Sequence, residues 1–223
     1  MKLIPAIDLK NNKVVTAMQG KKRNYSEISK KLSPSSDPLA FIQYLLSIHH
    51  FNTIYLADLD SIVNFKSECS LIDKILAKFP NINFIIDNGV RKYSQLNRYK
   101  NTNYIQVVAT ETYEDYIDLV NERYSNLILS LDFKNKKLIK KNNNYKYLTP
   151  KKVISMNLDN IGMKNGINKE NASYAKELFP NAEIIISGGI GCTSDIIEAK
   201  KNGFNEVVLL TAILEKKILY SNL

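Results

Sequence analysis

Short apolar runs alternate with longer amphipathic stretches along most of the chain. Continuous apolar runs predict buried strands, and stretches with apolar positions three and four residues apart predict helices. The predicted strands lie at 3–7, 53–57, 82–86, 104–108, 126–131, 153–157, 183–186 and 206–210. The predicted helices lie between them, at 37–48, 68–79, 113–123, 169–179 and 193–202, with weaker patterns at 92–99 and near Thr149.

This alternation predicts an α/β fold with a parallel sheet. Eight strands separated by helices over 223 residues favour a closed (β/α)8 TIM barrel, because an open sheet usually has fewer strands. A doubly wound open sheet is the alternative. The length suits one hydrophobic core, so we expect a single domain over residues 1–223.

Two pairs of segments within the chain resemble each other. Residues 79–90 align without gaps on 179–190, with about half of the positions identical, and residues 7–15 align on 131–139. These matches relate the first strand to the fifth and the third to the seventh. They predict an internal duplication of half-barrels, at about 1–123 and 124–223, unless a turn motif before an apolar strand has recurred by chance.

Two aspartates follow apolar strand residues at related positions, Asp8 in the first strand and Asp132 in the fifth. The active site of a parallel barrel lies at the carboxyl ends of its strands, and the first and fifth strands face each other across the barrel. Opposed carboxyl groups there can serve as general base and general acid, for which we propose Asp8 and Asp132 respectively. The alternative is that each carboxylate only caps the turn after its strand.

The segment Ser187-Gly188-Gly189-Ile190-Gly191 joins the seventh strand to a helix. Glycines allow the backbone to approach an anion, and the loops after strands seven and eight are the recurrent phosphate site of such barrels. The related loop after the third strand begins Asp87-Asn88. A carboxylate repels phosphate, so we expect a poorer anion site there.

Two further carboxylates, Asp58 and Asp60, follow the second strand. They could orient substrate hydroxyl groups or bind Mg²⁺, although aspartates at strand ends more often cap turns. We expect no metal site. The two cysteines, Cys69 and Cys192, are far apart in sequence and are expected to be reduced thiols.

The chain carries 31 basic and 22 acidic residues, a net charge of +9. The basic residues are scattered, and their densest cluster, at 134–141, is predicted to be a solvated loop. We therefore expect surface lysines that attract a small anionic metabolite, and no nucleic-acid partner. Without a long apolar stretch or a signal peptide pattern, the sequence predicts a cytoplasmic protein with no membrane contact.

The motifs taken together resemble the histidine-biosynthesis barrel family, which contains a phosphoribosyl imidazole-carboxamide isomerase and a related cyclase. The matching segments, in order, are Ile4-Pro5-Ala6-Ile7-Asp8-Leu9, Gln19-Gly20, Asp37-Pro38-Leu39, Leu56-Ala57-Asp58-Leu59-Asp60, Leu131-Asp132 and Ser187-Gly188-Gly189-Ile190-Gly191.

The resemblance implies an Amadori-type isomerase that works without metal or cofactor on a small phosphorylated metabolite. It implies catalysis by Asp8 and Asp132, and a chain that is a monomer or a weak homo-oligomer. The implied substrate-binding residues are Gln19, Asp58, Asp60 and Asp159, and the implied phosphate-binding residues are Ser187, Gly188, Gly189, Gly191 and Thr211.

The chain also departs from that family. Met156 stands where the family has a catalytic threonine, and Asp87-Asn88 replaces glycines at the second of two phosphate sites. These departures are similar to those of a divergent branch found beside methanopterin-linked one-carbon genes in methylotrophs. This similarity implies an isomerase-like or lyase-like step on a substrate with one phosphate in the synthesis of such a cofactor (tetrahydromethanopterin or methanofuran). A barrel that binds a phosphorylated ligand without catalysis is the third alternative.

Overall fold

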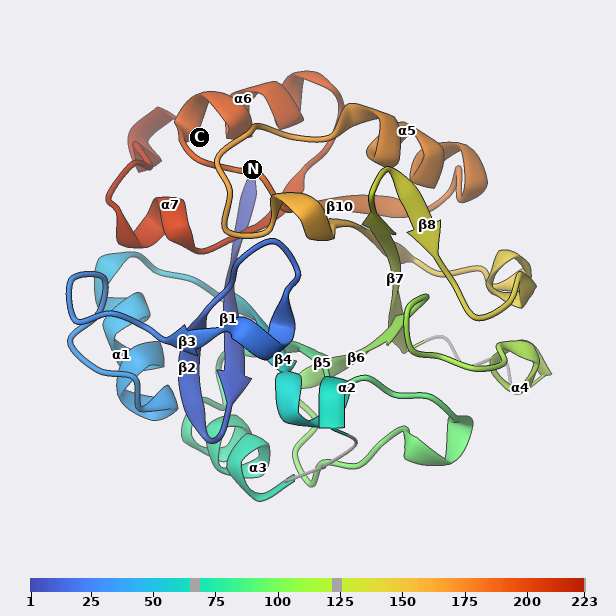
Figure 1. Cartoon of the computed structure of the whole chain (residues 1–223), viewed down its shortest axis with the longest axis horizontal. Coiled ribbons are helices and arrows are strands. Elements are labelled where there is room, and N and C mark those ends of the chain that lie inside the picture. The colour runs from blue at the N-terminus through green and yellow to red at the C-terminus, as the bar shows by residue number, and fades with distance from the viewer. Residues whose placement is uncertain (65–68, 122–125, 223) are drawn as a thin grey trace.

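The computed structural model describes residues 1–64, 69–121 and 126–222, and it contains a closed barrel of eight parallel strands (Figure 1). The barrel strands are β1 (Lys2–Lys10), β4 (Thr53–Asp58), β5 (Asn83–Asp87), β6 (Tyr104–Ala109), β7 (Leu127–Lys134), β9 (Lys152–Asn157), β10 (Glu183–Ser187) and β11 (Glu206–Leu209). Parallel pairing of β11 with β1, with Leu3 opposite Val207, closes the ring. The predicted (β/α)8 barrel is confirmed, and the predicted boundary between its halves lies outside the described residues.

Helices surround the ring: α1 (Pro38–Ile48), α2 (Leu59–Asn64), α3 (Cys69–Lys78), α4 (Ile117–Asn121), α5 (Lys169–Leu178), α6 (Thr193–Lys201) and α7 (Thr211–Leu214) (Figure 1). Short 3-10 turns occur at Lys22–Asn24, Tyr93–Gln95, Asn144–Tyr147, Leu158–Asn160 and Tyr220–Asn222. Within the described residues, no helix combines the length and apolar character needed to cross a membrane.

Two weakly predicted helices are absent, and a third is shorter than predicted. The pattern at 92–99 gives only the turn Tyr93–Gln95, and the region near Thr149 has the turn Asn144–Tyr147 in place of a helix. Polar side chains compete with the helix for backbone groups, as where the Asn142 side chain accepts the N–H of Asn144. Likewise, Asp115 accepts the N–H of Ile117, where α4 begins four residues later than predicted.

The strands are buried on both faces, which explains why they are apolar without interruption. Each barrel strand contributes at least one inward-pointing residue to an inner cluster: Ile4, Tyr55, Ile85, Val107, Ile128, Ile154, Ile185 and Val208, with Ala57, Ala109 and Met156 as second residues of β4, β6 and β9. The alternate residues pack outward against the helices. Because side chains alternate with a period of two, the inner position of each strand fixes which later residues face the pocket at its carboxyl end.

Two barrel strands extend beyond the ring into hairpins. β1 pairs with β2 (Lys13–Thr16), which pairs with β3 (Ser26–Glu27), and β7 pairs with β8 (Lys137–Ile139). The basic stretch at 134–141, predicted to be a loop, therefore contains the turn and second strand of a hairpin. The prediction was wrong because apolar Leu138 and Ile139 pair with Phe133 and Asp132.

The two hairpins have the same type of turn, and in each an aspartate carboxylate accepts a backbone N–H of the turn. Both turn residues have positive φ, 51° and 60° at Asn11 and Asn12, and 51° and 59° at the corresponding pair 135–136, which is the geometry of a type I′ turn. Asp60 accepts the N–H of Asn11 at 2.5 Å, and Asp159 accepts the N–H of Asn135 at 2.6 Å. The sequence repeat between 7–15 and 131–139 thus corresponds to a repeated structure.

Candidate active site

A pocket lies at the carboxyl ends of the barrel strands and encloses about 1010 Å³ of empty space, open solvent at its mouth included. Its charged lining residues come from one side, from β1, β5, β7 and the segments that follow β2 and β6: Asp8, Lys22, Asp87, Glu111 and Asp132. The side formed by β9, β10, β11 and the loops that follow them carries no charged lining residue within the described chain. The pocket therefore has an acidic half and a neutral half.

Strand alternation carries the two proposed catalytic aspartates into this pocket. Asp8 is four residues after inward-facing Ile4, and Asp132 is four residues after inward-facing Ile128. Residues an even number apart on a strand share a face, so both aspartates point inward. Both lie one residue before the end of the parallel pairing in the ring, where Asp8 is opposite Ala57 and Asp132 is opposite Met156. The structure thus brings the two carboxyl groups to one cavity.

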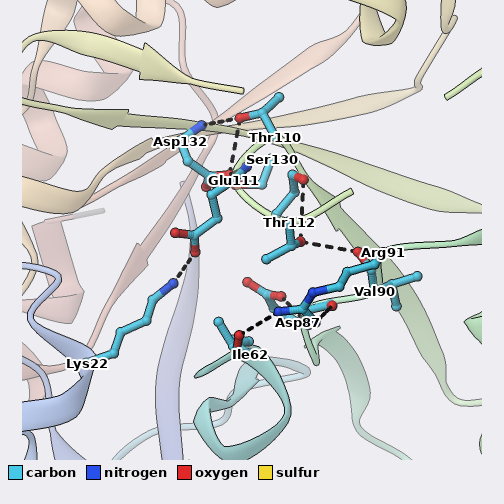
Figure 2. Close-up of polar contacts among 12 residues, drawn as sticks. Lys22, Ile62, Asp87, Val90, Arg91, Thr110, Glu111, Thr112, Ser130 and Asp132 are labelled. Carbon is cyan, nitrogen blue, oxygen red and sulfur yellow. Dashed lines mark hydrogen bonds and ion pairs between the residues drawn. The ribbon is translucent and has the colours of Figure 1, made fainter. Parts of the chain in front are cut away.

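Asp132 is 2% exposed, and its carboxyl group accepts three hydrogen bonds. The Ser130 hydroxyl donates to Oδ1 at 2.7 Å, and the Thr110 hydroxyl and the Glu111 N–H donate to Oδ2 at 3.2 and 3.0 Å (Figure 2). These donors favour the ionised form, but burial and the Glu111 carboxylate outweigh them and raise the pKa of Asp132 to about 7.

The Asp8 side chain retains some accessible surface on the pocket, although protein atoms surround it on most sides. Burial raises the pKa of Asp8 to about 7. The Lys22 ammonium opposes this shift, and the Asp87 carboxylate adds to it. The two candidate catalytic groups therefore both titrate near neutral pH, where a group can either donate or accept a proton.

An ion pair between Lys22 and Glu111 spans the acidic half of the pocket (Figure 2). Their side chains are only 16% and 19% exposed. Burial lowers the pKa of Lys22, but the carboxylates of Glu111, Asp87 and Asp132 outweigh burial and raise it. Sequence reasoning missed this pair because Lys22 lies among several basic residues in an irregular segment, where no periodicity indicates which one points inward.

The loop after β5 uses its own groups where a second phosphate would have to bind. Asp87 accepts the Tyr55 hydroxyl at 3.0 Å and the N–H of Gly89 at 3.1 Å. The Arg91 guanidinium donates to the carbonyl oxygens of Gly89 and Ile62 at 2.8 and 2.9 Å (Figure 2). An amide and a guanidinium that could attract an anion are thus both directed to groups of the protein.

The neutral half contains the glycine loop after β10. Gly188 and Gly189 have φ of 92° and 96°, a region that favours glycine. A Cβ on Gly188 would lie 2.4 Å from the carbonyl oxygen of Asn157, and one on Gly189 would lie 2.0 Å from that of Gly166. Both positions require glycine, and both line the pocket beside Ser187 and Thr211.

Gly191 does not line the pocket. Its N–H donates to the Asp195 carboxylate at 2.7 Å, and the N–H of Cys192 donates to the same oxygen at 3.1 Å. The start of α6 is therefore capped by its own acidic residue.

The implied substrate-binding residues also lie outside the pocket lining. Asp58 has the parity opposite to inward-facing Tyr55 and caps α2, where it accepts the Ser61 N–H at 3.2 Å and hydroxyl at 2.6 Å. Asp60 and Asp159 hold the hairpin turns described above. The N–H of Gln19 donates to the carbonyl oxygen of Ile161. Within the described residues, no group of three or more His, Cys, Asp or Glu side chains is arranged to hold a metal ion.

Comparisons with known proteins identify the family of the chain. A family model described as "Histidine biosynthesis protein" matches residues 2–219. An uncharacterised protein of Methanocaldococcus jannaschii is 30% identical over 96% of this chain and 93% of its own length. Phosphoribosyl imidazole-4-carboxamide isomerases of Buchnera aphidicola (subsp. Cinara cedri) and Pyrococcus furiosus are 28% and 24% identical, over 98% and 97% of this chain and 96% and 90% of their own lengths.

Proposed function

Because the chain belongs to the family of histidine biosynthesis proteins, we propose that it is an isomerase that converts a phosphorylated aldose into a ketose by acid–base catalysis. The observation that carries the proposal is that Asp8 and Asp132, each with a pKa raised to about 7, line the same pocket. The opposite side of this pocket is formed by the glycine loop after β10, here called the glycine cradle (Gly188 and Gly189). Such a pair can move protons at neutral pH.

The proposed reaction is an Amadori-type rearrangement of an aldosylamine phosphate. Asp132, in its protonated form, donates its proton to the ring oxygen as the sugar ring opens. Ring opening leaves a protonated Schiff base at C1, and Asp8 removes the proton from C2 to give an enaminol. Asp8 then returns this proton to C1 while the C2 hydroxyl gives its proton back to Asp132, which yields the aminoketose and restores both groups. The substrate and product are isomers, so the step needs no oxidant and no co-reactant.

We propose further that the substrate carries a single phosphate. The glycine cradle at Gly188 and Gly189, with the Thr211 hydroxyl beside it, supports phosphate binding in the neutral half of the pocket. In the other half, Asp87 would repel a second phosphate, and the Gly89 amide is already bonded to it. Lys22 is paired with Glu111 and cannot fully compensate a second anion.

Complementation of a histidine auxotroph tests whether the chain acts on a substrate with one phosphate or on the histidine-pathway substrate, for which the resemblance implies two phosphates. We expect no growth without histidine when this chain is expressed in a bacterial auxotroph that lacks the isomerase. The same protein is expected to convert N-(5-phosphoribosyl)aniline, an aldosylamine with one phosphate, into its ketose. Growth of the auxotroph would contradict the single-phosphate proposal and leave the isomerase proposal standing.

A phosphate-binding barrel without catalysis gives a different result. It would bind the monophosphate but would not convert it, and the variants Asp8→Asn and Asp132→Asn would change nothing except affinity. Binding of this probe without ketose formation, with equal affinity in the original chain and in both variants, would contradict the proposed roles of the two aspartates.

A further inference from the structure

Lys22 is the one lysine or arginine that lines the pocket within the described part of the chain. It comes from the segment between β2 and β3, and its ammonium group pairs with Glu111 on the segment that follows β6 (Figure 2). The backbone N–H of Glu111 in turn donates to Asp132. One ion pair therefore connects a loop of the first half of the barrel to the candidate acid.

The titratable groups that face Asp8 come from every charged part of the pocket: Lys22, Tyr25, Tyr55, Asp87, Glu111 and Asp132. The elements β9, β10 and β11 and their loops present no acidic or basic lining residue in the described chain. Asp8 thus shares a partly desolvated pocket with three other carboxyl groups and a single cation. Carboxyl groups in such a setting take up protons unless a cation balances them.

We propose that Lys22 is a positioning residue that, held in place by Glu111, favours the ionised form of Asp8 and so supports the base of the proposed reaction. The roles of acid and base rest on the proposed function, whereas the electrostatic effect of Lys22 on Asp8 does not depend on it. Without the ammonium group, Asp8 would be protonated at neutral pH and could not accept the C2 proton.

The ion pair of Lys22 and Glu111 has different effects on the pKa values of the two aspartates. Its carboxylate raises the pKa of Asp132, which favours the protonated form of that group. Lys22 acts in the opposite direction on Asp8, whose pKa it lowers. The Lys22 ammonium thus favours the ionised form of Asp8, as it does that of Asp87, while the Glu111 carboxylate favours the protonated form of Asp132.

Titration of the carboxyl groups tests this inference without a substrate. The ¹³C side-chain carboxyl signals of aspartate are followed against pH in the full chain, and Asp8→Asn and Asp132→Asn assign the two signals. In Lys22→Gln we expect the titration midpoint of Asp8 to rise by about one pH unit or more. Lys22→Arg, which keeps the charge, is the matched control and should leave the midpoint within about 0.3 pH units of the original.

Glu111→Gln gives the complementary result, a lower titration midpoint for Asp132 with the protein still folded. Lys22→Met, which keeps the apolar stem of the side chain, replaces Lys22→Gln if the latter does not fold. An Asp8 midpoint that stays unchanged in a folded Lys22→Gln or Lys22→Met protein would overturn the inference, as would an equal rise in Lys22→Arg.

An activity measurement distinguishes failure of this inference from failure of the proposed function. If the chain converts the monophosphate probe, the acid limb of kcat/KM against pH should move upward in Lys22→Gln by the same amount as the Asp8 midpoint. Turnover with an unshifted limb would overturn the role of Lys22 while the isomerase stands. A shifted midpoint in a chain without turnover would support the charge relation and contradict the isomerase.

Discussion

Replacement of Asp8 by asparagine is expected to lower kcat/KM for the monophosphate probe by about 10³-fold, because the amide cannot accept the C2 proton. Asparagine has nearly the same volume as aspartate and lacks the charge, so the pocket should keep its shape. Affinity for the phosphate group should change little, since the glycine cradle lies on the other side of the pocket. Ketose formation with purified protein gives kcat/KM, and calorimetry with the same probe gives the affinity.

Asp60→Asn is the matched control for this experiment. Asp60 lies near the same end of the barrel but accepts the N–H of Asn11 outside the pocket lining, and an amide oxygen can keep that bond. We expect kcat/KM to stay within about twofold of the original value. Equal losses in both variants would mean that charge near the mouth, and not proton transfer by Asp8, sets the rate.

Replacement of Gly189 by alanine is expected to abolish phosphate binding and to destabilise the fold by about 3 kcal/mol. The alanine Cβ would lie 2.0 Å from the carbonyl oxygen of Gly166, and the φ of 96° disfavours any L side chain. The loop must therefore move away from the position in which its backbone faces the pocket. Urea unfolding measures the loss of stability, and the rise in Tm in phosphate over chloride at equal ionic strength measures binding.

Gly203→Ala separates backbone strain from steric overlap. Gly203 has a φ of 83°, but a Cβ there would meet no atom within 4 Å, and the residue is remote from the pocket lining. We expect a cost of about 1 kcal/mol and an unchanged phosphate effect on Tm. An undiminished phosphate effect in Gly189→Ala would show that the anion binds elsewhere.

The barrel and its pocket could be predicted from sequence because both follow from simple periodicities. Continuous apolar strands identify the ring, and the period of two along a strand carries Asp8 and Asp132 inward from Ile4 and Ile128. The same rule would have placed Asp58 on the outer face, since it directly follows inward-facing Ala57. Parity was therefore an available signal for the capping role of Asp58.

Other parts of the site depend on irregular backbone, which no periodicity describes. Lys22 lines the pocket from the first position of a 3-10 turn, and Glu111 lines it from the segment that follows β6. Asp60 and Asp159 accept backbone N–H groups of the two hairpin turns, contacts that no periodicity predicts, and their binding of substrate stays a prediction. The relation to one-carbon cofactor synthesis stays a prediction, because a pocket defines ligand chemistry and not a pathway.

A crystal structure of the chain with inorganic phosphate tests the central proposal most directly. The account predicts one bound phosphate, against the backbone of Gly189 and beside Thr211 in the neutral half of the pocket, and none beside Asp87 and Gly89. A second phosphate at Gly89, or no phosphate at Gly189, would contradict it.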